Sequence, residues 1–452
     1  MKSLSRYYLW ISIVALLGAL MVSPAMAVET TLQESVRGAL QTNPRLDILQ
    51  HNQRAIEHEV KQVKSGYYPR LDMTLGYGTE AHDDEITRAR GDDDTFQQRG
   101  EAALILSQLL YDGGETYRRV SAEKRKLDSA EKRVLDNAEA IALDAVIAHM
   151  QVYRQQELLM LAEQNARDHQ EIIEMLQELQ EGGAGNRADV VQAQGRLARS
   201  RVSVAETKSD LRQAEANYIR VVGKPLDSLT FNRLSAAIAP ETLTAPASLE
   251  EALGLTRCGN PKVLALLANM NEANQRIGVV KTKFYPKTYL ELRTSYEEEV
   301  ESSQTYENNH QAMVRMRWNL LNGGADMHER RAATSRHAQA SSAHANQLVD
   351  VLEETRNTWA QYIAAQETKA AYTDAVNYNQ KTLDSYLQQF KVAQRTLLDV
   401  LDARNELFQS SGQLVTTQVN EVVAASRLRA LAGQLNETLS IDPVLYEVAE
   451  TE

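Results

Sequence analysis

The sequence predicts a mainly α-helical chain that contributes four strands to a membrane β-barrel. Three observations predict this fold: two long segments without proline, residues 70–224 and 287–442; four short segments in which apolar and polar residues alternate; and one internal duplication. Proline in a helix interior costs about 3 kcal/mol or more, so its absence permits very long helices. Alternation with a period of two is typical of strands in a sheet that has one apolar face.

The two halves of the chain are copies of one another. LQESVRGALQTNPRLDIL, residues 32–49, matches LEEALGLTRCGNPKVLAL, residues 249–266. A Tyr-Pro pair and then a Gly-Gly pair follow in each copy. A single duplication of this size differs from a solenoid, which repeats every 20 to 50 residues or so. The expected junctions between elements are Pro69, Gly113, Gly114, Pro286, Gly323 and Gly324.

The duplication divides the chain into five parts. Each repeat is expected to hold a helix broken at Asn-Pro, two strands, a long helix and a returning helix. The N-terminal segment has a positive start, the apolar run YYLWISIVALLGALMV and an AMA cleavage site, although an uncleaved anchor is an alternative. The predicted parts are a signal peptide (1–27), the first repeat (28–222), a linker or equatorial region (223–247), the second repeat (248–433) and a C-terminal equatorial segment (434–452).

Alternation locates the strands. The clearest pattern is in the first strand, where four apolar residues share one face: Leu71, Met73, Leu75 and Tyr77. Such segments suit a half-buried sheet of a soluble protein, and they also suit an outer-membrane barrel. The strands are expected at about 70–80, 96–109, 287–299 and 308–321.

The long helices decide between these alternatives. Nothing interrupts the helical pattern from Gly114 to about Glu181, or from Gly324 to about Val392. At 1.5 Å per residue each is a rod of about 100 Å, whereas helices of globular domains average about 11–12 residues. Apolar residues spaced by three and four indicate a coiled-coil seam. Because an open sheet edge in lipid leaves backbone groups unsatisfied, other copies must complete the barrel, and three copies would supply about twelve strands.

Composition excludes several classes of function. The net charge of -12 argues against nucleic acid as a partner, because phosphate binding needs a basic surface. Cys258 is the only cysteine, so it cannot form an internal disulfide, and no lipid-anchor cysteine follows the predicted cleavage site. No phosphate-binding Gly-Lys motif and no metalloprotease His-Glu motif occurs. We therefore expect no enzyme activity, no cofactor and no metal.

At this point the chain resembles the TolC family of outer-membrane efflux and type I secretion channels. The resemblance covers essentially the whole mature chain. It implies a homotrimer whose twelve-stranded outer-membrane barrel, four strands per chain, continues into a long α-helical coiled-coil barrel through the periplasm. The matching stretches are NPRL and NPKV, YYPRLDMTLGYG and FYPKTYLELRTSY, LLYDGG and NLLNGG, and RTLLDVLDARNEL.

The resemblance also implies a periplasmic gate at the ends of the helical hairpins. Asp399 and Asp402 resemble inward-facing acidic rings, and Arg395 resembles the basic member of the links that hold the gate shut, with Asp189 as its acceptor. Phe390 stands where the family usually has a tyrosine. From the residues alone an alternative remains: Thr396 with Asp399, and Asn186 with Asp189, have the spacing of helix N-caps.

The expected function is a passive exit duct of a tripartite export system. It would work with a periplasmic adaptor protein and an inner-membrane ABC or proton-driven transporter, in contact with outer-membrane lipid. Its cargo would be proteins in type I secretion or small toxic compounds, and the missing lipid-anchor cysteine favours secretion. The alternative is a periplasmic coiled-coil adaptor without a pore, although an adaptor should have one hairpin and this chain has two.

Overall fold

A computed structural model describes most of the chain. The expected signal peptide, and most of the expected linker and C-terminal segment, lie outside the described residues. Those are residues 31–83, 85–91, 95–183, 185–223, 244–299, 305–392 and 394–442.

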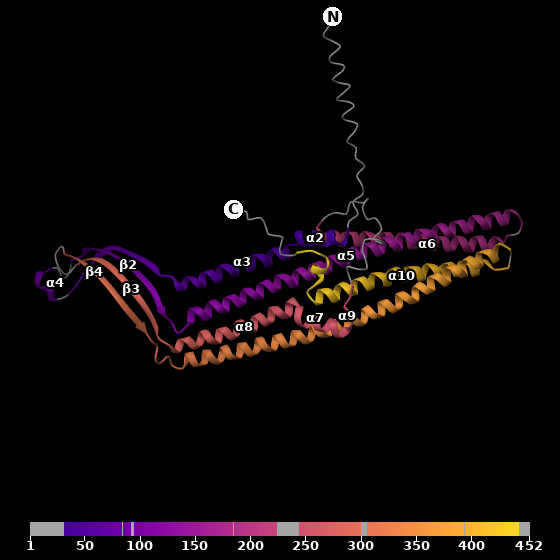
Figure 1. The fold of residues 1–452 in the computed structure, drawn as a ribbon. Coiled ribbons are helices and arrows are strands. Elements are labelled where there is room, and N and C mark those ends of the chain that lie inside the picture. Colours follow the sequence, from indigo (N-terminus) through magenta and orange to yellow (C-terminus); the bar gives the residue numbers. More distant parts are fainter. Residues whose placement is uncertain are drawn as a thin grey trace, which may run out of the picture.

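The molecule is a long rod with a four-stranded sheet at one end and two helical hairpins at the other (Figure 1). The first repeat contains α2 (Leu32–Thr42), α3 (Pro44–Lys64), η1 (Ser65–Tyr67), β1 (Arg70–Glu80), α4 (Glu85–Arg90), β2 (Gln97–Tyr111), α5 (Glu115–Glu181) and α6 (Arg187–Val222). The second contains α7 (Leu249–Gly259), α8 (Pro261–Lys281), η2 (Thr282–Phe284), β3 (Lys287–Glu299), β4 (Thr305–Arg317), α9 (Ala325–Lys391) and α10 (Leu397–Leu431), and α11 (Leu435–Thr438) follows.

The Asn-Pro pairs divide a helix in the same way in both repeats. Asn43 ends α2 and also caps α3, where its side chain accepts a 3.0 Å hydrogen bond from the N–H of Arg45. Asn260 does the same between α7 and α8 by accepting from Val263. Proline suits the next position because a first-turn N–H has no partner within the helix.

The proline-free segments form two helices of 67 residues each, α5 and α9. Each packs against its returning helix, α6 or α10, to make a hairpin. An apolar core lies along the middle of the rod, where α2, α5, α6, α10 and α11 meet, and a second lies near the hairpin tips. Within the described residues, no helix combines the length and the apolar character needed to cross a membrane.

The four strands form one antiparallel sheet in the order β1-β2-β3-β4. Because β1 and β4 lie at the two edges, each presents unpaired backbone groups in the single chain. β4 begins and ends a few residues earlier than the predicted 308–321. The last pair joins Lys287 to Arg317, and Pro286, which directly precedes β3, has no N–H to extend the ladder.

One face of the sheet is apolar and exposed. The register places Met73 opposite Leu104, and Leu290 opposite Val314, so most apolar side chains of the four strands share this face. Thr74, Glu291 and Arg315 lie on the opposite, polar face. The exposed large side chains of the apolar face include Leu71, Met73, Leu75, Tyr77, Leu104, Leu292, Tyr296, Val314 and Met316.

Candidate functional site at the hairpin tips

The tip of the first hairpin is the glycine-rich loop between α5 and α6. Asn186 caps α6 by accepting a 3.0 Å hydrogen bond from the N–H of Ala188, as the capping interpretation predicts. Asp189 is half-buried in the first turn of α6, where a negative charge is favourable near the helix N-terminus. Among the described residues, no ion pair reaches its carboxylate.

The tip of the second hairpin is closed by a capping box. The N–H of Asp399 donates to the hydroxyl of Thr396 at 3.3 Å, and the N–H of Thr396 donates to the carboxylate of Asp399 at 3.2 Å. The Thr396 hydroxyl and N–H, followed by the nearby charge of Arg395, hold the pKa of Asp399 below its ordinary value. Asp399 therefore caps its own helix, whatever further role it has.

Arg395 makes its contacts within its own hairpin. Its guanidinium lies 4.3 Å from the ring centre of Tyr386, and its Nε donates to Gln389 at 3.0 Å. A guanidinium nitrogen also lies 3.8 Å from the carboxylate of Asp399. No ion pair joins Arg395 to Asp189 in the described part of the single chain.

Tyr386 was missed by the sequence reasoning, which considered only the position of Phe390. The two aromatic residues are four apart on α9, so they lie on the same face of the helix. Both are half-buried and pack against the apolar cluster near the tips. Phe390 therefore contributes packing, while the tyrosine one turn earlier contacts the arginine.

Asp402 has a partner on the other hairpin. Its carboxylate accepts a 3.1 Å hydrogen bond from Arg196 of α6, and both side chains are partly exposed. A second pair crosses between the hairpins at Asp168 of α5 and Arg404 of α10, and its side chains are only 11% and 17% exposed. Sequence reasoning missed Arg196, Asp168 and Arg404, because the partners lie more than 200 residues apart in the chain.

His169 lies beside these pairs and is buried. Burial, followed by the positive charges of Arg404 and Arg196, lowers its pKa, while Asp168 acts in the opposite direction. Its Nδ1 is buried and has no hydrogen-bond partner among the described residues. The imidazole is therefore neutral at neutral pH, and the charges of this region are those of the two Asp–Arg pairs.

The predicted junction residues lie where the sheet meets the helices. Gly113, Gly114, Gly323 and Gly324 all have positive φ angles, of 67°, 82°, 53° and 83°. In this region glycine is favoured because it has no Cβ. Gly114 and Gly324 occupy the N-cap positions of α5 and α9. Pro69 and Pro286 directly precede β1 and β3.

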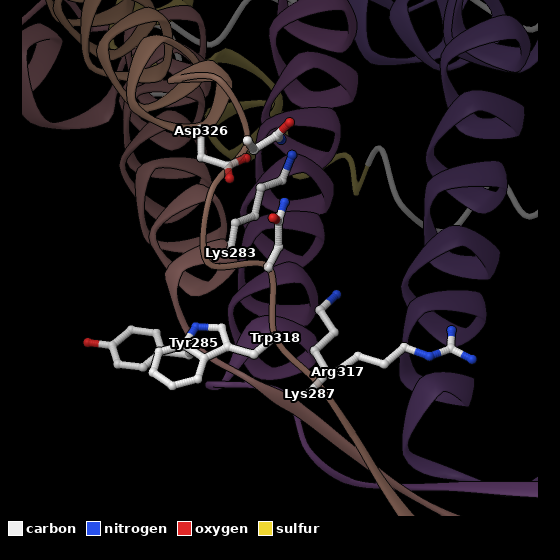
Figure 2. A pocket seen from close by; sticks show the side chains of 8 residues that line it. Lys283, Tyr285, Lys287, Arg317, Trp318 and Asp326 are labelled. Carbon is white, nitrogen blue, oxygen red and sulfur yellow. The ribbon is translucent and has the colours of Figure 1, made fainter.

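A cavity of about 490 Å³ lies at the junction of the second repeat. Figure 2 shows the rings of Tyr285 and Trp318 lying together, while Lys287 and Arg317 extend away from them. The indole N–H of Trp318 donates to the carbonyl of Phe284 at 3.2 Å, which fixes the ring just beyond the end of β4. Aromatic residues here border the exposed apolar face of the sheet.

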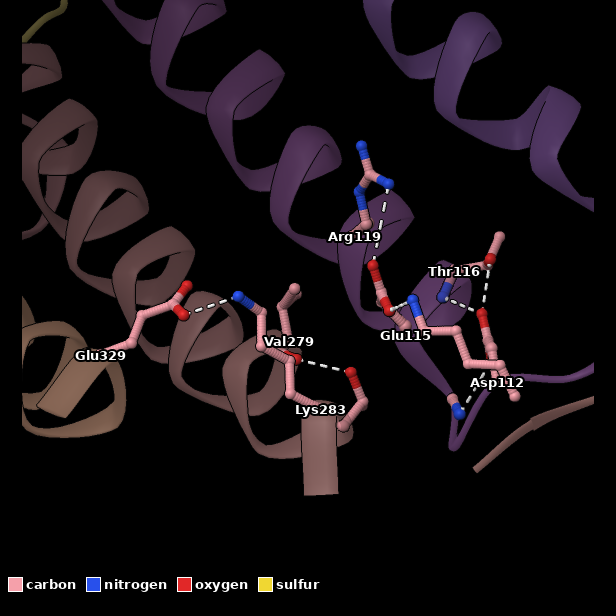
Figure 3. A network of polar contacts seen from close by, with 10 residues as sticks. Asp112, Glu115, Thr116, Arg119, Val279, Lys283 and Glu329 are labelled. Carbon is pink, nitrogen blue, oxygen red and sulfur yellow. Dashed lines mark hydrogen bonds and ion pairs between the residues drawn. The ribbon is translucent and has the colours of Figure 1, made fainter. Parts of the chain in front are cut away.

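Polar contacts hold the junction of the first repeat together and join it to β3 of the second (Figure 3). Asp112 accepts from the N–H of Gly114 at 2.9 Å and from the N–H of Thr116 at 2.7 Å. Burial raises the pKa of Asp112, but the hydrogen bonds from Thr116 and Gly114 outweigh it, and the net pKa is lowered. Glu115 forms an ion pair with Lys287, which links the start of α5 to β3. These contacts fix the position of the sheet relative to the helices.

Comparison with known families gives a match in both repeats. The model of the family described as "Outer membrane efflux protein" matches residues 36–224 and again residues 252–434. This chain belongs to the outer membrane efflux protein family. The two matches fall on the two copies of the duplication.

Two individual relatives match most of the chain, and a third matches a shorter part of it. Outer membrane efflux protein BepC of Brucella suis is 26% identical over 433 residues, which covers 93% of this chain and 90% of BepC. Alkaline protease secretion protein AprF of Pseudomonas aeruginosa is 22% identical over 406 residues, covering 88% and 83% of the two chains. Outer membrane protein TolC of Escherichia coli is 29% identical over 99 residues, 22% of this chain and 19% of TolC.

Solved structures show the same fold. The outer membrane protein VceC of Vibrio cholerae superposes with a TM-score of 0.73 at 18% identity, covering 90% of this chain and 95% of VceC. CusC superposes with a TM-score of 0.73 at 16% identity. The chain is therefore a TolC-family outer-membrane channel protein that extends into the periplasm, and it is not an enzyme. Membership favours the channel over the adaptor alternative.

Proposed function

We propose that three copies of this chain form the outer-membrane duct of a tripartite export system. The observation that carries the proposal is the sheet. It exposes a broad apolar face and leaves β1 and β4 at open edges. In lipid those edges must pair, and β4 of one copy next to β1 of another would close a barrel of about twelve strands.

In this proposal the helical hairpins continue the barrel through the periplasm. Their tips would meet an adaptor protein, which joins the duct to an inner-membrane ABC or proton-driven transporter that supplies the energy. The grooves for the adaptor would lie near residues 178–197 and 388–407. The barrel would sit in outer-membrane lipid, with the aromatic residues of the junction at the membrane boundary.

The test of the assembly is direct. Purified protein should migrate on gels as a heat-modifiable trimer and should carry ions across a planar lipid bilayer. A water-soluble monomer that never conducts would refute the duct. Two proline substitutions provide the test and its control. Val314→Pro, in edge strand β4, should block assembly, because proline cannot donate to a ladder. Asn319→Pro, just after the sheet, should leave assembly intact.

We further propose that the tips form a gate. Three copies would bring Asp399 and Asp402 into acidic rings that attract cations. Since Arg395 does not pair with Asp189 within one chain, this link would join neighbouring copies, and Phe390 would support it by packing. Replacing both residues, Asp189→Asn with Arg395→Gln, should raise conductance. Arg187→Gln, a nearby exposed charge on α6, is the control.

For the cargo, we propose protein secretion. AprF is a protease secretion protein and so is PrtF of Dickeya chrysanthemi, which is 24% identical over 409 residues. BepC, which is named as an efflux protein, makes drug export the second candidate. Deleting the gene and comparing secreted proteins and drug sensitivity separates the two. Loss of a secreted protein with unchanged sensitivity supports secretion, and the reverse pattern supports efflux.

A further inference from the structure

The sheet–helix junction of the first repeat contains a cavity of about 370 Å³. This volume lies within the range of small-ligand sites, about 300–1,000 Å³. The end of α3, the turn η1 and the start of α5 surround it. Its lining includes two lysines and three tyrosines, which are Lys64, Lys124, Tyr67, Tyr68 and Tyr117.

Two positive charges at this cavity are not neutralised. Lys64 and Lys124 are exposed, and within the described part of the chain no ion pair reaches either ammonium group. Lys126, two residues further along α5, differs because it pairs with Glu59 of α3. Among the described residues, no Asp or Glu lines the cavity. The cavity therefore suits an anion, to whose oxygens the tyrosine hydroxyls can donate hydrogen bonds.

The aromatic residues place the cavity beside the apolar face of the sheet. In the second repeat, Trp318 follows Met316 of that face by two residues, which is the period of a strand. Figure 2 shows the ring of Tyr285 beside Trp318, while Arg317 extends the other way. Tyr68 is the equivalent of Tyr285 in the first repeat, since each directly precedes the proline before a strand. Tyr68 is 72% exposed and therefore extends the apolar face toward the cavity.

Unpaired cations lie at the same level of the second repeat. Lys281 ends α8 as Lys64 ends α3. Arg330 and Arg331 on α9 occupy the positions of two cavity-lining residues of α5. In the described ranges none of these three cations joins an ion pair. Both repeats therefore place positive charge at one level, just beyond the apolar face.

This level faces the inner leaflet of the outer membrane. The protein extends from the outer membrane into the periplasm, so the end of the sheet that joins the helices lies on the periplasmic side. Lipid phosphates lie directly outside the apolar core of a bilayer. Tyrosine and tryptophan are enriched at that depth, and basic pockets there bind anionic headgroups.

We propose that the cavity binds the headgroup of an anionic phospholipid from the inner leaflet. Lys64 and Lys124 would hold the phosphate, and the acyl chains would lie along the apolar face of β1. A free phosphate ion has the same charge chemistry, but the continuity of the cavity with the lipid-facing surface favours the lipid. The inference rests on the outer-membrane location of the protein and goes beyond the proposed duct.

Native mass spectrometry of the detergent-purified protein counts retained lipid molecules. The wild type should retain more phosphatidylglycerol than zwitterionic phosphatidylcholine. Lys64→Gln with Lys124→Gln should weaken binding at the cavity about tenfold or more. At a lipid concentration that just fills the wild type, this variant should lose about one phosphatidylglycerol per chain. Lys64→Arg with Lys124→Arg keeps both charges and should retain the lipid.

The control is Lys262→Gln with Lys381→Gln. These exposed lysines of α8 and α9 lie away from the junction, so the pair removes the same charge without touching the cavity. It should retain phosphatidylglycerol at the wild-type level. Heat-modifiable gel migration checks the assembly of each variant. Where a double variant does not assemble, Lys64→Gln and Lys124→Gln are measured singly, and each should bind more weakly than the wild type.

Three outcomes would overturn the lipid site. They are equal retention of the two lipids by the wild type, equal losses in the cavity and control variants, and displacement of the lipid by an equal concentration of inorganic phosphate. The last result would show a site for the free ion. A protein that conducts without preferring phosphatidylglycerol would leave the duct standing. One that binds the lipid at the cavity but never conducts would refute the duct and support the lipid site.

Discussion

The carboxylate of Glu139, in the middle of α5, accepts a 3.0 Å hydrogen bond from the backbone N–H of Leu435 at the start of α11. It also accepts from the backbone N–H and the side-chain amide of Asn436, at 3.3 and 3.1 Å. The first N–H groups of a helix have no partner within it. Glu139 supplies those partners and so attaches the C-terminal segment to the long helix.

Glu139→Gln should stabilise the protein more at alkaline than at acid pH. Burial raises the pKa of Glu139 to about 7, despite hydrogen bonds from Asn436 and Leu435 that lower it. A carboxyl group whose pKa is higher in the folded than in the unfolded state lowers the free energy of unfolding as the pH rises from about 4.5 to about 7. The wild type therefore loses stability toward alkaline pH, and the glutamine variant does not lose this contribution. Glutamine cannot ionise and still offers an acceptor. Thermal unfolding of the two proteins at about pH 5 and pH 8 measures the difference.

The matched variant is Glu139→Leu, which fills the space but accepts no hydrogen bond. It should lower the unfolding temperature at both pH values, because the N–H groups of Leu435 and Asn436 would be buried without partners. A glutamine variant as unstable as the leucine variant at about pH 8 would contradict the explanation.

His149 should contribute a loss of stability on acidification, in the direction opposite to the contribution of Glu139. Its ring is fully buried and its Nδ1 lies 2.8 Å from the hydroxyl of Ser35. Burial lowers the pKa of His149 to about 4. The unfolded chain takes up a proton below about pH 6.5 and the folded chain does not, so up to about 3 kcal/mol is lost between about pH 6.5 and pH 4.

His149→Gln isolates this contribution. The variant keeps a polar group near Ser35 but cannot take up a proton, so the unfolding temperature of the variant minus that of the wild type should rise as the pH falls from about 6.5 to about 4. Since Glu139 acts in the opposite direction in both proteins, its effect cancels in the difference. Parallel pH curves for variant and wild type would show that His149 does not titrate on unfolding.

Gly113→Ala should destabilise the sheet–helix junction more than Gly323→Ala. Both glycines have positive φ, where a side chain costs about 1–2 kcal/mol. A Cβ on Gly113 would also lie 2.8 Å from the Cβ of Tyr285, whereas a Cβ on Gly323 has nothing within 4 Å. Thermal unfolding of the trimers gives the comparison. Equal losses of thermal stability in the two variants would mean that the junction relaxes away from Tyr285.

Leu75→Arg should block insertion into the outer membrane, and Thr74→Arg should not. The two residues are neighbours on β1 with side chains on opposite faces, and Leu75 lies on the exposed apolar face. An arginine facing lipid costs about 2–4 kcal/mol near the membrane centre, whereas one facing the lumen meets water. Membrane fractionation reports both variants. Similar outer-membrane levels for the two would contradict the assignment of the faces.

Local patterns determined much of the architecture from the sequence alone. The missing prolines predicted the lengths of α5 and α9, and alternation located the strands, because backbone conformation responds to each residue and its near neighbours. The capping boxes and the positive-φ glycines could be located for the same reason. The end of β4 could not be located from its own residues, since it depends on Pro286, just before the paired strand β3.

Only the tertiary structure decided which polar groups meet. Arg404 and Asp168 are 236 residues apart, and Leu435 and Glu139 are 296 apart. No local pattern marks one carboxylate on a long helix as buried and its neighbours as solvated. Burial depends on which helix packs alongside, and the free energy of a charge depends on burial. The sequence by itself determined the two hairpins, and their packing determined the contacts that hold them together.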